Sequence, residues 1–595
     1  METPIPTNDS GPDSRSSHRQ PATTPHASLP KAAGSALERS ITNGRDVQPR
    51  RVANDLFEPK AIITALFIYG LDATGYASVA ANDTSRRDPF RAGRLRYMTE
   101  DTATIDDDIA QRPEPTPPRS AVPRASTWTV WTLFLASLGV LALTVRGGAG
   151  WELSPLLRID GLTAVMWVVV TFFSGIVHSY SRRYMAGDSD IDRFFARVLG
   201  FTVAVMTMTA ANHVALFVAA WLAMGLLMAS LIGHVRDWSQ ARAAGRVARR
   251  YFLASSALLA GSVAVLVWAT DATTLTGVLE GLEGVPRPVG LVAAAGIVLA
   301  AIIQSALFPF HNWLLSSMTA PTPASALMHA GFVNAGGILL TRFAPLVGDR
   351  LVVMSAIVLV GAGSALLGQA MILVQTDVKR KLGCSTIAQM GFMILQCGLG
   401  FFAAAIAHLI LHGFYKAYLF LSSGAGVERV ASKDAGYTEL GFAGVAVSLV
   451  TAVGGGALFG VLTGKATSLT LNSGMILTLV VVLTTLTAAR DILRRSTLPT
   501  TVRFVSVPLV VLTAIGGYAV LFNAVSLMLS GVPMTHVSTA MTAVHYLVVA
   551  LFAGAYLVAE LGWYRSSERL YVALLNVSQP SPTTVLTAKE EYNDA

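Results

Sequence analysis

Long apolar runs, each separated from the next by a short polar stretch, occupy the chain from Thr127 onward. A run of about 20 apolar residues is long enough to cross the hydrocarbon core of a bilayer as a helix. We count roughly fourteen such runs, with an error of about two, because several are separated by only a few residues. They lie at about 127–145, 161–180, 195–212, 214–233, 251–270, 288–308, 324–343, 351–375, 384–400, 402–424, 441–463, 472–489, 505–529 and 541–562. The pattern predicts an all-α polytopic membrane protein.

The chain is polar before and after these runs. Residues 1–125 are rich in Ser, Thr, Pro, Asp and Arg, and they cannot bury enough apolar surface to offset the entropy of ordering. Within them, Ala61–Gly70 is about ten apolar residues, which is too short to span and favours a transient surface helix. Met98 is an alternative initiator. We therefore predict a disordered N-terminal tail (1–125), a transmembrane domain (126–562) and a C-terminal tail (563–595).

Charge distribution predicts how the chain is oriented. Hydrophobic residues make up 53% of the sequence and charged residues 13%. The net charge of +8 comes from Lys and Arg in short loops, so it implies no nucleic-acid partner. The loops after even-numbered runs hold most of these residues, including Arg182, Arg183, Arg236, Lys379, Arg380, Arg490 and Arg494. By the positive-inside rule both termini face the cytoplasm, and the surrounding medium of the helices is membrane lipid.

The stretch Gln304–Arg342 interrupts the helical pattern at membrane depth. Its first apolar half ends at Pro309, and two further prolines occupy the link that follows. The second half, a helix expected at 326–340, carries His329 and Asn334 among apolar residues. Broken helices are tolerated in a membrane only where protein or water receives their freed backbone groups. This location favours a functional His329, with a structural hydrogen bond as the alternative.

A second interruption lies at 458–476, where Gly464, Lys465 and Asn472 divide an apolar run. Paired interruptions in the two halves of a transporter indicate its pathway. The alternative is that Lys465 ends one helix and lies in an external loop.

The strongest candidate site is His408, His412 and Lys416. Steps of four residues advance only about 40° around a helix, so the three side chains share one face. Histidine exchanges protons near neutral pH, and such a column is costly in a spanning helix unless it faces a polar interior. A proton relay is the favoured interpretation. Structural hydrogen bonding and metal binding are the alternatives, although the glutamate and third ligand of an HExxH zinc site are absent.

Weaker candidates lie elsewhere. Asp377, Lys379 and Arg380 stand at the end of an apolar run, where they are either ordinary helix-end charges or part of a proton pathway. Cys384 and Cys397 form no CxxC or Cys/His cluster. We expect no disulfide, metal site or cofactor in this chain.

Five motifs resemble the antiporter-like membrane subunits of respiratory complex I (NuoL-like) and of Mrp cation/proton antiporters. They are HSYSRRYMAGD at 178–188, FPFHNWL at 308–314, APTPASALMHAGFVNAGG at 320–337, QTDVKRKLGCSTIAQMGFM at 375–393 and AHLILHGFYKAYLFLSSGA at 407–425. Within this superfamily the sequence is most similar to the DabB branch, the membrane subunits of inorganic carbon uptake complexes. The resemblance implies two inverted five-helix repeats, each with a broken helix, and it raises the relay interpretation of the His408 column.

The sequence also departs from the family. In complex I subunits a glutamate and a lysine of the first repeat form a switching ion pair, and the matching positions here are Leu222 and Gln304. Both are neutral, as expected if the pair was lost as a unit, because a single unpaired buried charge costs several kcal/mol. Gln304 remains a candidate pathway residue only as a hydrogen-bonding group.

The resemblance implies a transporter subunit and not an enzyme. It would conduct protons or another cation and would form a complex with a DabA-like, zinc-containing cytoplasmic subunit similar to carbonic anhydrase. CO₂ or bicarbonate uptake would be coupled to that flow. The alternative is an ion-translocating subunit of an NADH-quinone oxidoreductase or an Mrp-type antiporter.

Overall fold

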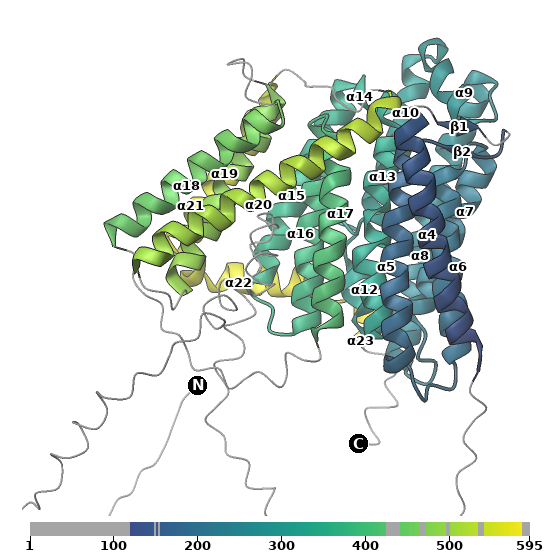
Figure 1. Ribbon diagram of the computed structural model, residues 1–595, viewed down its shortest axis with the longest axis horizontal. Helices are drawn as coiled ribbons and strands as arrows, with labels where there is room; N and C mark the ends of the chain where they lie inside the picture. The colour runs from purple at the N-terminus through teal and green to yellow at the C-terminus, as the bar shows by residue number, and fades with distance from the viewer. Residues whose placement is uncertain are drawn as a thin grey trace, which may run out of the picture. The chain divides into compact units, whose positions relative to one another are not determined.

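The computed structural model describes residues 120–147, 150–152, 155–423, 441–464, 472–495, 500–533 and 541–585. This part of the chain is built of helices (Figure 1), with a small antiparallel pair of strands, β1 (Trp151–Glu152) and β2 (Arg158–Ile159). The all-α prediction is confirmed. Lys465, Ala61–Gly70 and Met98 lie outside the described residues.

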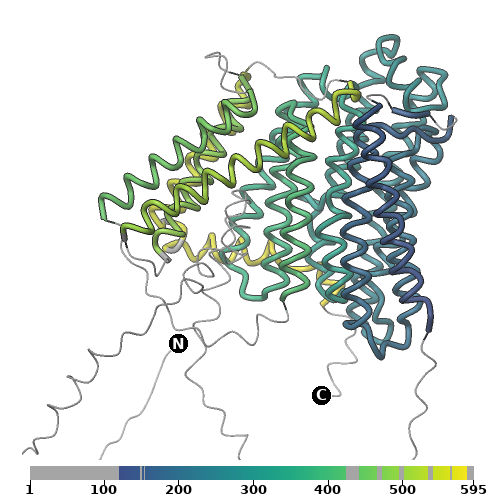
Figure 2. The backbone as a smooth tube through the Cα atoms, in the orientation of Figure 1, coloured from purple at the N-terminus to yellow at the C-terminus, as the bar shows by residue number. Residues whose placement is uncertain are grey.

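The helices before the first break lie side by side with roughly parallel axes (Figure 2). They are α4 (Val122–Gly147), α5 (Gly161–Tyr184), α6 (Ile191–Ala210), α7 (Val214–Ile232), α8 (Ser239–Thr270) and α10 (Arg287–Gln304). The short helices α9 (Leu275–Glu280) and η2 (Gly281–Gly284) lie in the chain between α8 and α10. The middle of the chain forms α11 (Asn312–Ser316), η3 (Ser317–Thr319), α12 (Thr322–Ala330), η4 (Phe332–Asn334), α13 (Ala335–Arg342), α14 (Ala344–Gly348), α15 (Leu351–Ile372), α16 (Val378–Gly398) and α17 (Phe402–Leu421). The remainder forms α18 (Phe442–Leu462), α19 (Ser473–Arg495), α20 (Thr500–Met528), η6 (Leu529–Gly531), α21 (Ala543–Glu560), η7 (Trp563–Ser566), α22 (Glu568–Val577) and α23 (Pro582–Val585).

Among the described residues, 13 helices are long and apolar enough to cross a membrane, when α12 to α13 is taken as one span. This number agrees with the roughly fourteen spans that the sequence predicts. The helix α16 is not among them although it has 21 residues. Its sequence includes Lys381, Gln389 and Gln396, and it packs between α15 and α17. A helix with polar residues at membrane depth is stable only when other helices cover those residues.

The expected continuous helix at 326–340 is wrong, because the chain is broken again inside it. Helix α12 ends at Ala330, and Gly331 to Asn334 form a turn before α13 begins. The side-chain Nδ2 of Asn334 donates to the Ala330 carbonyl oxygen at 2.7 Å. The Ser305 hydroxyl, at the end of α10, donates to the Val333 carbonyl oxygen at 2.8 Å. Side chains therefore receive the backbone groups at this break, as a low-dielectric interior requires.

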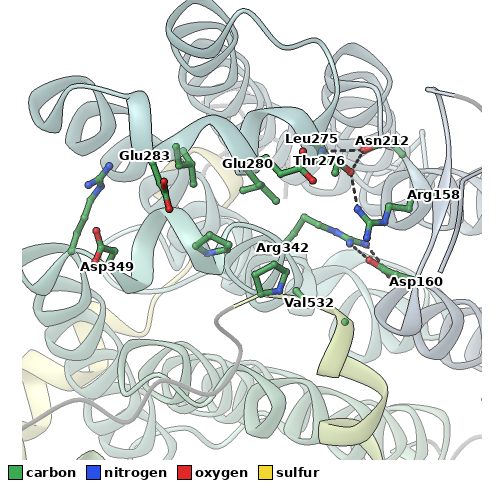
Figure 3. Close-up of a pocket in the computed structure, with 17 residues that line it drawn as sticks. Arg158, Asp160, Asn212, Leu275, Thr276, Glu280, Glu283, Arg342, Asp349 and Val532 are labelled. Atoms are coloured by element: carbon green, nitrogen blue, oxygen red, sulfur yellow. Dashed lines mark hydrogen bonds and ion pairs between the residues drawn. The ribbon is translucent and has the colours of Figure 1, made fainter. Parts of the chain in front are cut away.

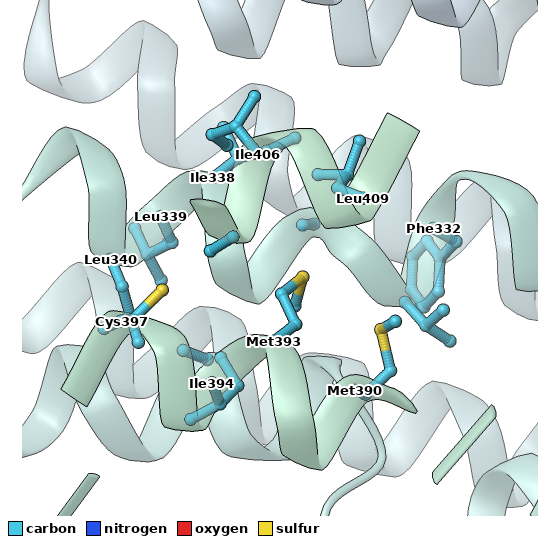
Figure 4. Close-up of a cluster of buried hydrophobic side chains, with 14 of the residues drawn as sticks. Phe332, Ile338, Leu339, Leu340, Met390, Met393, Ile394, Cys397, Ile406 and Leu409 are labelled. Carbon is cyan, nitrogen blue, oxygen red and sulfur yellow. The ribbon is translucent and has the colours of Figure 1, made fainter. Parts of the chain in front are cut away.

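The core of the described region lies where α13, α16 and α17 meet (Figure 4). Figure 4 shows Met393 and Ile394 of α16 beneath Ile338 and Leu339 of α13. These four side chains are at most 4% exposed. The broken segment is thus held by apolar packing on the same helices that carry the candidate site.

The C-terminal segment packs back onto the first break. The ring of His311, in the loop before α11, contacts the Val577 carbonyl oxygen through Nε2 at 3.0 Å. Gln375 donates to the Ser578 hydroxyl at 2.5 Å, and the Ser581 amide donates to the Ser316 hydroxyl at 3.0 Å. The sequence predicts only a cytoplasmic C-terminal tail here. The described part of it, through residue 585, is folded against the ends of α8 and α15.

Helices α15 and α16 approach each other closely along a line of glycines. A Cβ added to Gly361 of α15 would lie 2.5 Å from the Leu395 backbone nitrogen. A Cβ added to Gly398 of α16 would lie 2.8 Å from the Val358 nitrogen. Small residues allow this approach, which is a principal means of association between membrane helices. A Cβ added to Gly363, two residues along α15, would meet no neighbouring atom within 4 Å.

We expect Gly361→Ala to destabilise the protein by about 1–3 kcal/mol, because the new methyl group meets backbone that cannot rotate away. Gly363→Ala is the matched control, and it should be neutral or slightly stabilising because alanine favours helix. Thermal unfolding of the purified proteins in detergent measures both. Equal melting temperatures for the two variants would contradict the close contact.

Candidate functional site: a buried histidine–lysine cluster

The predicted column on α17 is buried along its full length. His408 and His412 are each 3% exposed, and Lys416 is fully buried. The imidazole rings of the two histidines are 6.0 Å apart between centroids. Spacing by four along the helix accounts for their alignment. The structure therefore brings together the three residues that the sequence assigned to one face.

Lys416 is bound by neutral groups of α16. Its ammonium group donates to the Ser385 hydroxyl at 2.5 Å and to the Leu382 carbonyl oxygen at 3.2 Å. Helices α12, α16 and α17 contain no Asp or Glu. A buried ammonium is costly unless polar groups receive it, and these two oxygens do so.

His329 of α12 joins the same group of residues. Its Nδ1 lies 2.9 Å from the Thr386 hydroxyl oxygen, and its ring stacks on Phe420 at 4.3 Å. The Thr386 hydroxyl itself donates to the Leu382 carbonyl oxygen at 2.9 Å. Because a hydroxyl has one proton to donate, Nδ1 of His329 is the donor to Thr386. The neutral ring then carries its lone pair on Nε2, which has no hydrogen-bond partner in the described structure.

We call these residues the central cluster: His329, Ser385, Thr386, His408, His412 and Lys416. The Leu382 carbonyl accepts from both Lys416 and Thr386, so it links the α12 and α17 sides of the cluster. Sequence reasoning missed Ser385 and Thr386. A signal was present, because Lys381, Ser385 and Gln389 recur at four-residue steps on α16.

The remaining candidates lie apart from the central cluster or at its edge. Lys379, near the start of α16, donates to the Ala320 carbonyl oxygen at 3.4 Å. Asp377 is exposed and caps α16 by accepting from the Arg380 amide at 2.7 Å. This contact is the ordinary one for an N-terminal helix cap.

Gln304 ends α10 and is fully buried, and neither end of its amide has a partner in the described structure. Leu222 is half-buried on α7, beside the fully buried Trp221. On α16, Gln396 is a second buried amide whose two polar atoms have no described partner. Sequence reasoning did not single out Gln396. Buried amides without partners are uncommon and mark positions where an unseen polar group is expected.

A buried ion pair lies at the opposite end of the broken segment, and sequence reasoning missed it as well. The guanidinium of Arg342, the last residue of α13, binds the carboxylate of Asp160, which caps α5. Arg342 also donates to the Thr209 carbonyl oxygen at 2.8 Å. Burial opposes the charged form of Asp160, but Arg342 and hydrogen bonds from Thr163 outweigh it and hold the pKa of Asp160 below its usual value.

Two family models match parts of this chain. Residues 211–487 match the family described as NADH:quinone oxidoreductase/Mrp antiporter, TM. Residues 148–195 match the N-terminus of chain 5 of NADH-ubiquinone oxidoreductase (complex I). The resemblance inferred from the motifs is confirmed. The chain is a multi-pass membrane protein that is similar to antiporter-like, NuoL-like subunits.

Three curated relatives match this chain over about half of its length. The chain is 37% identical to a probable inorganic carbon transporter subunit DabB1 of Halothiobacillus neapolitanus, over 47% of this chain and 51% of the relative. It is 39% identical to a probable inorganic carbon transporter subunit DabB of Bacillus subtilis, over 50% of this chain and 59% of the relative. It is 35% identical to NADH-quinone oxidoreductase subunit L of Mycobacterium tuberculosis, over 46% and 44%. The chain spans about half the length of the curated relatives it matches.

We expect Thr386→Val to release the ring of His329 from its fixed tautomer, because valine keeps the shape of threonine but offers no acceptor. The variant should lose about 1 kcal/mol of stability. Nitrogen NMR shifts of ¹⁵N-histidine-labelled protein report the tautomer directly. Thr341→Val is the matched control, since Thr341 is equally buried and bonds only its own helix, to the Gly337 carbonyl oxygen at 2.8 Å. A His329 signal unchanged in Thr386→Val would contradict this assignment.

Proposed function

We propose that this chain is the proton-conducting membrane subunit of an energy-coupled inorganic carbon uptake complex. The central cluster is the observation that carries the proposal. Three ionisable residues of α17 and one of α12 lie at membrane depth, and two of them, Lys416 and His329, are joined through the Leu382 carbonyl and Thr386. An inert membrane anchor would gain nothing from buried ionisable groups.

Protons would move through the cluster by exchange among its bases. His408 and His412 lie one turn apart, and Lys416 follows one turn later. Histidine accepts and releases protons near neutral pH. The free Nε2 of His329 offers a further acceptor on α12. Lys379 and Asp377, at the start of α16, and Lys465 of the second interruption are the proposed outlets, with Gln304 as a neutral hydrogen-bonding member of the pathway.

The coupling would lie at the cytoplasmic side. We place both termini in the cytoplasm of a multi-pass cell-membrane protein, in accord with the basic loops. The partner would be a DabA-like, zinc-containing cytoplasmic subunit that hydrates CO₂. Zinc-bound water must lose a proton to become the attacking hydroxide. A directed proton flow at that site would therefore make hydration effectively one-way.

The second candidate function is ion translocation in an NADH-quinone oxidoreductase or in an Mrp-type cation/proton antiporter. The similarity to subunit L of Mycobacterium tuberculosis favours it. The neutral residues Leu222 and Gln304 count against it, because they remove the ion pair that resemblance to complex I implies for the first repeat.

We expect His412→Ala and Lys416→Met to abolish carbon-dependent growth and proton flux while the protein still inserts into the membrane. The substituted residues lie in the proposed relay, and both replacements remove a polar group from an apolar bundle instead of adding one. His213→Ala, at the half-buried cap of α7, is the control. Wild-type uptake in both cluster variants, at equal protein abundance, would refute the relay.

The neutral first repeat gives a separate test. Gln304→Lys alone should lower abundance, because an unpaired buried charge costs roughly 3–5 kcal/mol. Adding Leu222→Glu should restore some abundance if the two positions face each other, but it should not raise proton flux. Flux above wild type in the double variant would indicate a degraded antiporter unit, and it would favour the second candidate function.

A further inference from the structure

We infer that the cavity between β2, α9 and α13 is where protons enter this protein from outside the cell, and that the Asp160–Arg342 ion pair is its gate. This inference rests on the proposed function, both for proton conduction and for the orientation of the chain. Neither the family resemblance nor the curated relatives assign a role to this cavity.

The cavity has a volume of about 560 Å³ and is rich in charged groups (Figure 3). Its lining includes Arg158, Asp160 and Arg342 at one side, and Arg350 with the carboxylates of Glu280, Glu283 and Asp349 elsewhere. Glu280, Glu283 and Asp349 are exposed. Exposed carboxylates around a hollow raise the local concentration of cations, including protons, near its buried groups.

The ion pair lies in the wall of this cavity. The side chain of Arg342 is 12% exposed and that of Asp160 is 8% exposed, and no other ion pair in the described residues has both partners so deeply buried. Thr163 adds a hydrogen bond to the Asp160 carboxylate at 2.8 Å. Asp160 is therefore the buried carboxylate that water in the cavity reaches.

Protonation of Asp160 would open the gate. A proton taken from cavity water turns the carboxylate into a neutral acid, and the attraction for Arg342 is lost. The charges that face Asp160 are then Arg342 from α13 and Arg158 from β2, with Arg350 and the three exposed carboxylates across the cavity. From α6 the Thr209 carbonyl oxygen, which is neutral, accepts a hydrogen bond from Arg342. An unpaired, buried guanidinium is costly, so Arg342 would turn toward the carboxylates of the cavity.

This movement acts on the segment that carries His329. Arg342 is the last residue of α13, and α13 follows α12 directly across the turn at Gly331 to Asn334. A break in a helix is a place where one half can shift without the other. Return of Arg342 to Asp160 would expel the proton, because the pair favours the ionised carboxylate. One proton thus binds and leaves per cycle of the gate.

Buried polar groups continue inward from Asp160 along α5. Thr171, Ser174 and His178 are all fully buried. The Ser174 hydroxyl lies 2.5 Å from that of Thr202 on α6 and 3.2 Å from Nδ1 of His178. Nε2 of His178 has no partner in the described structure. Helix α5 also packs against α12 and α17, which carry residues of the central cluster. The polar groups of α5 would therefore receive a proton released from Asp160 on its way to that cluster.

The test measures proton flux into right-side-out membrane vesicles that contain the full chain in its complex. Asp160→Asn should lower the flux roughly a hundredfold, the lower end of what a positioned proton-transfer group contributes, and should remove its dependence on external pH. The double variant Asp160→Asn with Arg342→Gln leaves no unpaired charge. It should recover abundance without recovering flux. Glu560→Gln, which removes the carboxylate partner of Arg490 elsewhere, is the matched control and should conduct normally.

Wild-type flux per molecule in the double variant would show a purely structural ion pair and overturn the inference. If His412→Ala blocks flux while Asp160→Asn does not, the gate is wrong and the proposed function stands. If the wild-type vesicles conduct no more protons than vesicles lacking the protein, the proposed function and the gate both fail.

A second measurement does not depend on the ion pair. Leu279→Cys places a thiol at the cavity wall, and the native Cys384 and Cys397 are buried. A bulky, cationic, membrane-impermeant thiol reagent added outside should then block flux. Thr273→Cys, exposed nearby but not in the cavity lining, should be insensitive. Full flux after complete labelling of Leu279→Cys would overturn the inference.

Discussion

The cost of burying the ammonium group of Lys416 among apolar helices is the constraint on which the centre of this structure depends. The Ser385 hydroxyl and the Leu382 carbonyl oxygen of α16 receive it. That requirement accounts for a helix as polar as α16 in the middle of the bundle.

The position of α16 depends in turn on backbone contact with α15. Gly361 and Gly398 let the two helices approach until a side chain no longer fits between them. Apolar side chains from α13 and α17 close the other faces of α16. In a bilayer there is no hydrophobic force to press helices together, so close packing must hold a polar helix in place. The close packing that stabilises the bundle therefore also sets the environment of Lys416.

The broken segment connects two buried polar sites. His329, on its first half, is held to Thr386, and Arg342, at the end of its second half, is held to Asp160. Between them the chain turns at Gly331, where the Asn334 side chain replaces a backbone donor. A segment fixed at both ends and jointed in the middle can transmit a change at one site to the other. The C-terminal residues that bind His311 brace the loop before this segment.

The sequence by itself determined the membrane helices, because a long apolar run is a local property that no distant contact alters. It also determined the shared face of His408, His412 and Lys416, since helical periodicity relates residues only four apart. The sequence by itself also shows that positions 222 and 304 are occupied by the neutral residues Leu222 and Gln304. The tertiary structure alone decided the pairing of Asp160 with Arg342, of His329 with Thr386 and of Val577 with His311. These partners are far apart in the chain, and only the packing of whole helices brings them within a hydrogen bond. The tertiary structure also decided the break at Gly331. A glycine in an apolar helix does not by itself break the helix, and the break is stable here because neighbours such as Ser305 bond the backbone groups that it leaves free.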